Sequence, residues 1–209
     1  MSIRSDERRG ALVAYDSLYW TQGLRVAGMD EAGCGALAGP VIAACVGMQP
    51  GSAIPGVDDS KKLSPAQRAN VYDKIVESAW FIGIGSASVE EIESLNILNA
   101  TRLAMVRAAQ GLESDLLLVD SRQDLPIACA QLGITHGDAT SYSIAAASIV
   151  AKVTRDRLME SLDADFAEYG FAKHKGYGTA AHYETILRFG PSILHRPSFL
   201  RNLSEKVRA

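Results

Sequence analysis

Cysteine is scarce in this sequence, and its pattern argues against two classes of protein. The 209 residues include 3 cysteines, Cys34, Cys45 and Cys129. Because the number is odd and no C-x-x-C pair occurs, neither a disulfide framework nor a zinc site is expected. Long apolar runs are also missing, and residues 1–27 are charged instead. We therefore expect no membrane span, no signal peptide and a cytoplasmic location.

A large excess of charge of one sign is likewise missing. The formal net charge of −3 does not by itself indicate a polyanionic partner. The charges are unevenly distributed, however: residues 152–209 contain 10 Lys and Arg against 7 Asp and Glu, whereas residues 1–151 contain 11 against 17. This division is expected if one region contacts phosphate and another holds cations, and a solvated surface explains it equally well.

The hydrophobic pattern predicts one α/β domain. With 47% hydrophobic residues, the chain is long enough for one substantial core and short for two domains. Apolar runs predict strands at 24–29, 40–48, 80–86 and 115–120, and helical periodicity predicts helices at 66–79, 89–112, 140–166 and 179–189. No repeat or linker divides residues 1–209, of which about 1–22 form an N-terminal extension. The pattern leaves the pairing of the strands open.

Four carboxylates stand where predicted elements begin or end. Asp30 and Glu31 follow the first strand and precede a glycine-rich turn, Asp120 ends the strand at 115–120, and Asp138 precedes the helix at 140–166. Each position also has an ordinary explanation, respectively a solvated surface pair, a turn-forming aspartate and a helix N-cap. Strand ends at the edge of an α/β sheet are nevertheless where ligands commonly bind.

If these acids converge on one site, the site requires cations. Neighbouring carboxylates repel one another and shift towards protonation unless a cation neutralises them. Oxygen-only ligands select a hard divalent ion, Mg²⁺ or Mn²⁺, which keeps some waters and shares phosphate oxygens with a substrate. The chemistry predicted is hydrolysis of a phosphodiester, with one ion activating water and another stabilising the leaving oxygen.

Several motifs together resemble the ribonuclease HII family and run in family order over most of the chain. They are VAGMDEAG at 26–33, LAGPV at 37–41, DSKKLS at 59–64, LVD at 118–120, GD at 137–138, AAASIVAKVTRDR at 145–157, HKGYGT at 174–179 and HRPSF at 195–199. The resemblance implies a ribonuclease H-like mixed β-sheet flanked by α-helices, with a helical C-terminal part.

The same resemblance implies an activity. A member of this family is a metal-dependent endonuclease that cuts the RNA strand of RNA–DNA hybrids and also cuts at ribonucleotides embedded in duplex DNA. Two metal ions assist the cleavage, which leaves 5′-phosphate and 3′-hydroxyl ends and serves the removal of RNA primers and misincorporated ribonucleotides. The partners expected from the resemblance are therefore these nucleic acids, and we expect a monomer that binds no membrane.

Roles for individual residues follow from the resemblance. The metal-binding acids of the family fall on Asp30, Glu31, Asp120 and Asp138. Substrate-binding positions of the family fall on Gly33, Cys34, Gly35, Lys61, Ser148, Lys152, Arg155 and Tyr177. In the family the glycine-rich turn reads the ribose 2′-OH, which is the atom that separates RNA from DNA. Taken singly, Tyr177 is typical of a half-buried packing residue and Lys61 of a solvated lysine.

Three positions depart from the family pattern. The family usually has Gly-Arg-Gly in the glycine-rich turn, and Cys34 stands at the arginine position. Ser121 stands where glycine is usual, and His136 stands where lysine is common. A missing guanidinium removes a bidentate phosphate contact, which costs about 1.5–3 kcal/mol of binding. An alternative function is therefore a catalytically impaired protein that binds RNA–DNA hybrids. Four acids argue against it, because uncompensated carboxylates repel phosphate.

Other candidate residues have simpler explanations. Asp156 lies four residues after Lys152, which favours an ion-paired helix face over a fifth metal-binding acid. His174 and His195 match no metal-ligand spacing, so packing or phosphate contact is the better interpretation. The turn at 33–38 fits the dinucleotide pattern G-x-G-x-x-A, but Gly39-Pro40 interrupts the helix that this pattern requires.

Overall fold

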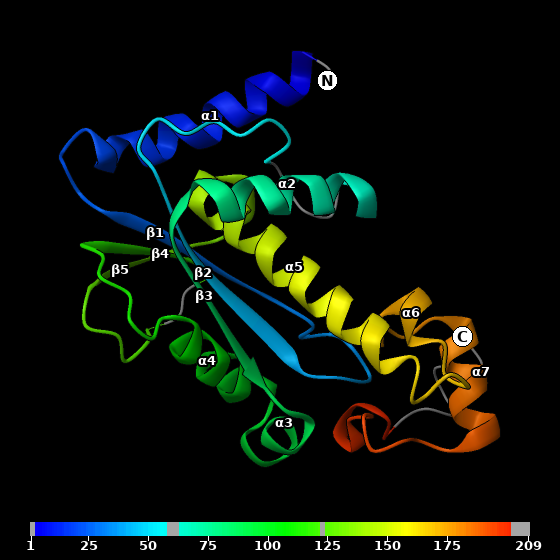
Figure 1. Cartoon of the computed structure of the whole chain (residues 1–209). Coiled ribbons are helices and arrows are strands. Elements are labelled where there is room, and N and C mark those ends of the chain that lie inside the picture. The colour runs from blue at the N-terminus through cyan, green and yellow to red at the C-terminus, as the bar shows by residue number, and fades with distance from the viewer. Residues whose placement is uncertain (1–2, 58–62, 122–123, 202–209) are drawn as a thin grey trace.

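The computed structural model describes residues 3–57, 63–121 and 124–201, and a mixed five-stranded sheet forms its centre (Figure 1). The strands lie in the order β3-β2-β1-β4-β5, with bounds β1 (Val26–Ala32), β2 (Val41–Met48), β3 (Ala79–Ala87), β4 (Leu116–Asp120) and β5 (Ala130–Ile134). Strand β1 is antiparallel to β2 and parallel to β4. Strands β2 and β3 pair antiparallel, and β4 and β5 pair parallel. The predicted α/β fold with a mixed sheet is confirmed.

Helices cover both faces of the sheet (Figure 1). One face carries α1 (Ile3–Trp20), α2 (Pro65–Ser78) and α5 (Tyr142–Leu162), and the other carries α3 (Val89–Leu95) and α4 (Ile97–Ala108). Side chains of β1 point to both faces of the sheet. Val26 packs in the core beneath α1, α2 and α5, and Met29 packs in the core beneath α3 and α4. In the described part of the chain, no helix is both long and apolar enough to cross a membrane.

The C-terminal part is helical, as expected. It contains α6 (Phe171–His174), α7 (Ala180–Phe189) and the short turn η3 (Pro197–Phe199), gathered beyond the last turns of α5 (Figure 1). A small apolar cluster that includes Ala38, Met159 and Phe171 joins this part to α5 and to the loop after β1. The loop after β1 and the C-terminal part therefore share one packing unit.

Helix α5 lies directly on β1. Its first half is alanine-rich, and Ala145, Ala146 and Ala147 are fully buried. A Cβ atom at Gly28 of β1 would lie 2.1 Å from the carbonyl carbon of Ser143, a distance that real Cβ contacts do not reach. Only glycine permits this approach, because no layer of side chains separates the two backbones. The contact fixes the depth at which α5 presents its side chains to the edge of the sheet.

The N-terminal extension forms α1, which the sequence analysis did not predict. The carboxylate of Asp16 accepts hydrogen bonds from the backbone N–H of Tyr142 at 3.2 Å and from the N–H and hydroxyl of Ser143 at 2.8 and 2.6 Å. An acid at this place satisfies free amides at the start of α5. Helix α1 therefore holds the first turn of α5.

Two predicted helices differ from the structure, and one strand was not predicted. The helix expected at 89–112 is interrupted at Asn96, whose φ of 67° lies in the left-handed region, and α4 ends at Ala108. The helix expected at 140–166 ends at Leu162. Strand β5 was missed because all five of its residues are exposed or half-buried and it carries no apolar run. The predicted starts of α2 and α7 agree with the structure to within two residues.

Candidate active site

Parallel pairing of β1 and β4 brings three of the predicted acids together. Met29 lies opposite Val119, so Asp30 and Asp120 follow at the same edge of the sheet. Together with Glu31 they line a pocket of about 270 Å³, which we call the acidic pocket. Its other lining residues are Ala32, Gly33, Cys34, Gly35, Ser148, Lys152 and Tyr177. Six of the eight positions predicted to bind substrate therefore line the same pocket as three of the four acids.

Asp30 is the most deeply buried of these three acids. Its side chain is 6% exposed, and burial, followed by the charges of Glu31 and Asp120, raises its pKa well above the usual range. The backbone N–H of Glu31 donates to Asp30 Oδ1 at 2.7 Å, and a hydrogen bond with Ser148 of α5 also favours the charged form. Like charges crowded in this way are stabilised by a bound cation.

Asp138 reaches the neighbourhood of the site through Asp120. Asp120 Oδ1 accepts a hydrogen bond from the N–H of Gly137 at 2.7 Å, which fixes the short turn Gly137–Ala139 that carries Asp138. Asp138 is 7% exposed but is not among the residues that line the acidic pocket. It is not the N-cap of α5 either, because Ser141 holds that position and accepts from the N–H of Ile144.

The carboxylates fit a divalent ion that is shared with a substrate. Among the described residues, no three His, Cys, Asp or Glu side chains converge closely enough to hold an ion by themselves. Mg²⁺ usually takes one or two carboxylates, keeps several waters and completes its shell with substrate phosphates, so it needs no protein cage. The oxygen-only donors and the raised pKa of Asp30 match such a site.

The glycine-rich turn is shaped by what lies beneath it. Gly33 has a φ of 99°, and a Cβ atom there would lie 2.1 Å from Nε of Arg155, so both conformation and space require glycine. The Cys34 thiol lies 3.4 Å from Glu31 Oε1 and 3.2 Å from the hydroxyl of Thr101 in α4. Burial, followed by the charge of Glu31, raises the pKa of this thiol to about 12, so it is not a reactive thiolate.

Arg155, one of the predicted substrate-binding residues, lies inside the protein and is 0% exposed. Its guanidinium donates to the carbonyl oxygens of Ala38, Pro40 and Lys175 at 2.9–3.0 Å, and a contact with substrate stays a prediction. Arg155 therefore contacts, from inside the protein, both the loop after β1 and the segment 175–179 between α6 and α7, which we call the Tyr177 loop. Lys61, another predicted substrate-binding residue, lies outside the described residues.

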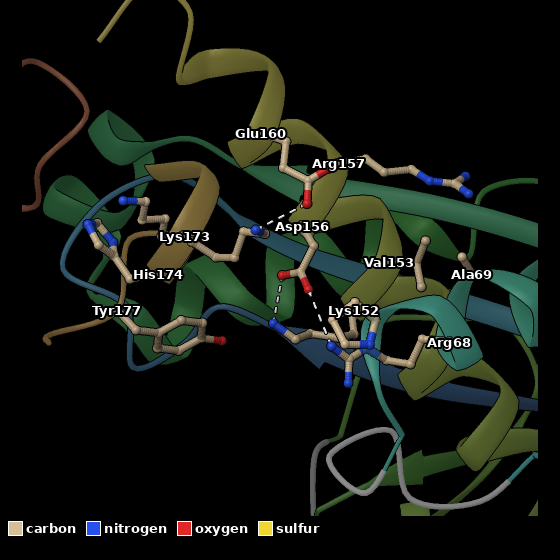
Figure 2. A pocket seen from close by; sticks show the side chains of 12 residues that line it. Arg68, Ala69, Lys152, Val153, Asp156, Arg157, Glu160, Lys173, His174 and Tyr177 are labelled. Atoms are coloured by element: carbon tan, nitrogen blue, oxygen red, sulfur yellow. Dashed lines mark hydrogen bonds and ion pairs between the residues drawn. The ribbon is translucent and has the colours of Figure 1, made fainter. Parts of the chain in front are cut away.

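A second cavity adjoins the acidic pocket. This basic groove, of about 430 Å³, lies between α2, α5 and α6 and shares Lys152 and Tyr177 with the acidic pocket (Figure 2). Its charged lining residues are Arg68, Lys152, Asp156, Arg157, Glu160, Lys173 and Lys175. Asp156 accepts from Lys152 at 2.6 Å and lies 3.9 Å from Arg68, so its interpretation as an ion-paired helix residue is confirmed. Cations outnumber carboxylates in this groove.

A cluster of histidines packs against the Tyr177 loop on its buried side. His182 Nδ1 lies 2.9 Å from the Tyr177 carbonyl oxygen, and His182 Nε2 lies 3.1 Å from Nε2 of His195. The ring of His174 stacks on His182 with centroids 4.1 Å apart. Of the two roles considered for His174 and His195, packing is the one that the structure shows. The sequence analysis gave no role to Thr101, to His182 or to buried Arg196, although Arg196 lies within the HRPSF motif.

Two of the departures from the family pattern share one backbone feature. Ser121 follows Asp120 with a φ of 65°, and His136 precedes Gly137 with a φ of 56°. Both values lie in the left-handed region that favours glycine, which gives a physical reason for glycine at position 121 in relatives. The two residues flank the hydrogen bond between Asp120 and Gly137, so the turns at these positions help to set its geometry.

Known proteins of one family are similar to this chain in sequence. The sequence model of the family described as Ribonuclease HII matches residues 27–202. A ribonuclease HII of Geotalea uraniireducens is 47% identical over 97% of this chain and 95% of its own length, and one of Syntrophotalea carbinolica is 52% identical over 84% and 85%.

Solved structures are also similar. The structure of the ribonuclease H2 of Pyrococcus horikoshii superposes with a TM-score of 0.70 and 25% sequence identity. The match covers 88% of this chain and 99% of the Pyrococcus chain. The ribonuclease HII of Archaeoglobus fulgidus, solved in complex with PCNA, matches 85% and 96%, with a TM-score of 0.73 and 25% identity. The chain described above belongs to the ribonuclease HII family.

Proposed function

We propose that this endonuclease cuts at ribonucleotides joined to DNA, in RNA–DNA hybrids and singly embedded in duplex DNA, with Asp30, Glu31, Asp120 and Asp138 as its metal-binding acids. The observation that carries this proposal is the register of β1 and β4, which places three carboxylates beside the turn Gly33–Gly35. Mg²⁺ or Mn²⁺ bound by these acids would activate the attacking water and stabilise the leaving 3′-oxygen.

The protein's own residues orient the acids and the nucleic acid. Ser148 and the Glu31 N–H hold the Asp30 carboxylate, and Gly137 holds that of Asp120, so neither must reorganise when substrate binds. Tyr177 lines both cavities, where its ring would stack on a sugar or base. Lys152 Nζ lies 5.4 Å from that ring, which places a cation beside the expected phosphate.

The basic groove gives the strand a path away from the site of cleavage. Because Lys152 and Tyr177 line both cavities, a backbone that leaves the acidic pocket enters a region rich in Arg and Lys (Figure 2). Cations along a groove neutralise phosphates and release counterions, which supplies affinity independent of sequence. We assign Arg68, Lys152 and Lys173 to this contact.

The alternative of a binding protein without cleavage is not favoured. Cys34 removes one guanidinium, but its thiol packs against Thr101 and leaves Gly33 and Gly35 at the pocket. The acids also remain, and a pure binding surface for phosphate gains nothing from them. A cytoplasmic location and a monomeric state stay predictions from the sequence.

Cleavage of a labelled DNA duplex with one embedded ribonucleotide tests the proposal. We expect a nick at the ribonucleotide with Mg²⁺ or Mn²⁺, none with a chelator, and none in a matched all-DNA duplex. The relative rates with the two ions identify the better cofactor. Binding of the duplex without a nick under either ion would establish the alternative function.

A further inference from the structure

Two arginines are fully buried behind the acidic pocket. Arg155 and Arg196 are the largest of the fully buried side chains, each 0% exposed. Within the described part of the chain, neither forms a salt bridge, and both guanidinium groups donate to main-chain carbonyl oxygens instead. Buried charge without a carboxylate partner is costly, so an apolar side chain would fill this space with less loss of stability.

Both arginines donate hydrogen bonds to the loop that follows β1. Arg155 joins the loop after β1 to the Tyr177 loop through the carbonyl oxygens of Ala38 and Lys175. Arg196 donates to the carbonyl oxygen of Gly39 from Nε at 2.9 Å and from Nη2 at 2.7 Å. Its remaining terminal nitrogen, Nη1, donates to the carbonyl oxygen of Cys34 at 3.1 Å.

The bond to Cys34 determines the direction of the next N–H. The peptide between Cys34 and Gly35 is trans, as are all peptides among the described residues, so its C=O and its N–H point in opposite directions. Since the oxygen points inward to buried Arg196, the Gly35 N–H points outward. Gly35 is exposed and lines the acidic pocket, and no hydrogen-bond acceptor for its N–H occurs among the described residues.

The charge on Arg196 strengthens this donor. A cation bound to a carbonyl oxygen polarises the peptide and makes its N–H a better hydrogen-bond donor, especially away from water. Burial, followed by the nearby charge of Arg155, lowers the pKa of Arg196 to about 10, so the group is still protonated at neutral pH. A neutral side chain of similar size would fill the space without this effect.

We propose that Arg196 is a positioning residue that sets the preference for ribose over deoxyribose. By holding the Cys34 carbonyl inward, it aims the Gly35 N–H at the 2′-oxygen of the nucleotide in the acidic pocket. The 2′-oxygen is an acceptor that DNA lacks. The inference rests on the proposed function in one respect, namely that a ribonucleotide occupies this pocket.

Binding selectivity tests this role. Dissociation constants are measured in Ca²⁺, without turnover, for a duplex with one ribonucleotide and for the same duplex in all-DNA form. We compare the unmodified protein with Arg196→Gln, Arg196→Lys and a control, Tyr169→Phe, which loses a 2.8 Å hydrogen bond to the Gly190 carbonyl in the same C-terminal part. Tyr169→Phe controls for loosening of that part in general.

The expected result is a change in the ratio of the dissociation constants for the all-DNA and the ribonucleotide duplex. Arg196→Gln should lower the preference for the ribonucleotide duplex by about tenfold, the value of one well-placed hydrogen bond, and should change affinity for all-DNA by less than about twofold. Arg196→Lys should retain part of the preference, and Tyr169→Phe all of it. Equal loss for both duplexes, or an unchanged ratio, would overturn the proposal. No preference in the unmodified protein would instead overturn the proposed function.

A measurement on the unmodified protein covers the case in which Arg196 variants do not fold. In a protein labelled with ¹⁵N-glycine, the Gly35 amide resonance should shift when the ribonucleotide duplex is added and shift much less with the all-DNA duplex. Gly35→Ala assigns the resonance, because a Cβ at this position meets no atom within 4 Å. The same shift with both duplexes would overturn the role given to this N–H.

Discussion

The acids and the recognition loops of this site are held in place by different means. Asp30 and Asp120 belong to neighbouring strands, so the backbone register of β1 and β4 sets their separation. The turn at Gly33–Gly35 and the Tyr177 loop belong to no strand and are held by buried side chains, mainly Arg155, Arg196 and His182. The sheet therefore positions the acids that we propose bind metal, and polar contacts between segments far apart in sequence position the loops that we propose bind substrate.

The difference affects stability as well as position. A central strand opens only with the whole sheet, whereas loops held by a few side-chain hydrogen bonds open at lower free energy. Conditions that weaken those side-chain contacts should therefore disturb recognition while the acids stay in place. Two substitutions and a change of pH should affect the acids and the loops differently.

The largest effect is expected from an acid. Asp120→Asn keeps an oxygen that accepts from the Gly137 N–H but removes the charge, so cleavage should fall by at least about 10²-fold while the melting temperature stays near that of the unmodified protein. Single-turnover rates and thermal melts measure the two quantities. Asp165→Asn, an exposed residue away from the pocket, serves as the control. Full activity in Asp120→Asn would remove this acid from the site.

Low pH should destabilise the Tyr177 loop and the helices that pack against it. Burial lowers the pKa of both His182 and His195 to about 4, so both are neutral in the folded protein. Between an unfolded pKa of about 6.5 and a folded pKa of about 4, the unfolded chain binds more protons, and stability is lost as pH falls through this window. We expect a loss of about 2–4 kcal/mol in the free energy of unfolding between pH 7 and pH 5.

Hydrogen exchange locates that loss. At pH 5, amides of the Tyr177 loop and α7 should gain exchange relative to pH 7, after correction for intrinsic rates, while those of β1 and β4 should not. Substituting His182 by glutamine should flatten the pH dependence of unfolding. A uniform increase across sheet and loops would show that the two regions do not differ in this way.

The smallest effect is expected at Cys34. Arginine at this position restores the cation of the family pattern, and since it is too long for the contact with Thr101, its guanidinium would extend towards the substrate phosphate. We expect KM to fall by about tenfold with little change in kcat. Cys34→Ser, which keeps the size of the side chain, should leave KM unchanged. An unchanged or higher KM in Cys34→Arg would count against a phosphate contact.

The same division separates what the sequence could predict from what it could not. Strands β1 to β4 were predictable because apolar runs mark them, and the motifs placed the acids at their ends. Strand β5 carries no apolar run, and α1 contacts α5 through Asp16, a contact that leaves no periodic signal. The break at Asn96 is local, because its side chain caps α4 by accepting from the N–H of Asn99, but apolar periodicity continues across it. The burial of Arg155 was equally unpredictable, because its motif gives no sign that the guanidinium would contact main-chain carbonyl oxygens inside the protein.

The contact between Gly28 and Ser143 has a consequence for the history of this protein. Ordinary cores change over generations by compensating exchanges of volume, in which one side chain grows as its neighbour shrinks. Here backbone meets backbone, so no neighbour can shrink to admit a larger residue. Exchanges of side-chain volume therefore cannot change the spacing between β1 and α5, nor the offset between Asp30 and Ser148 that depends on it.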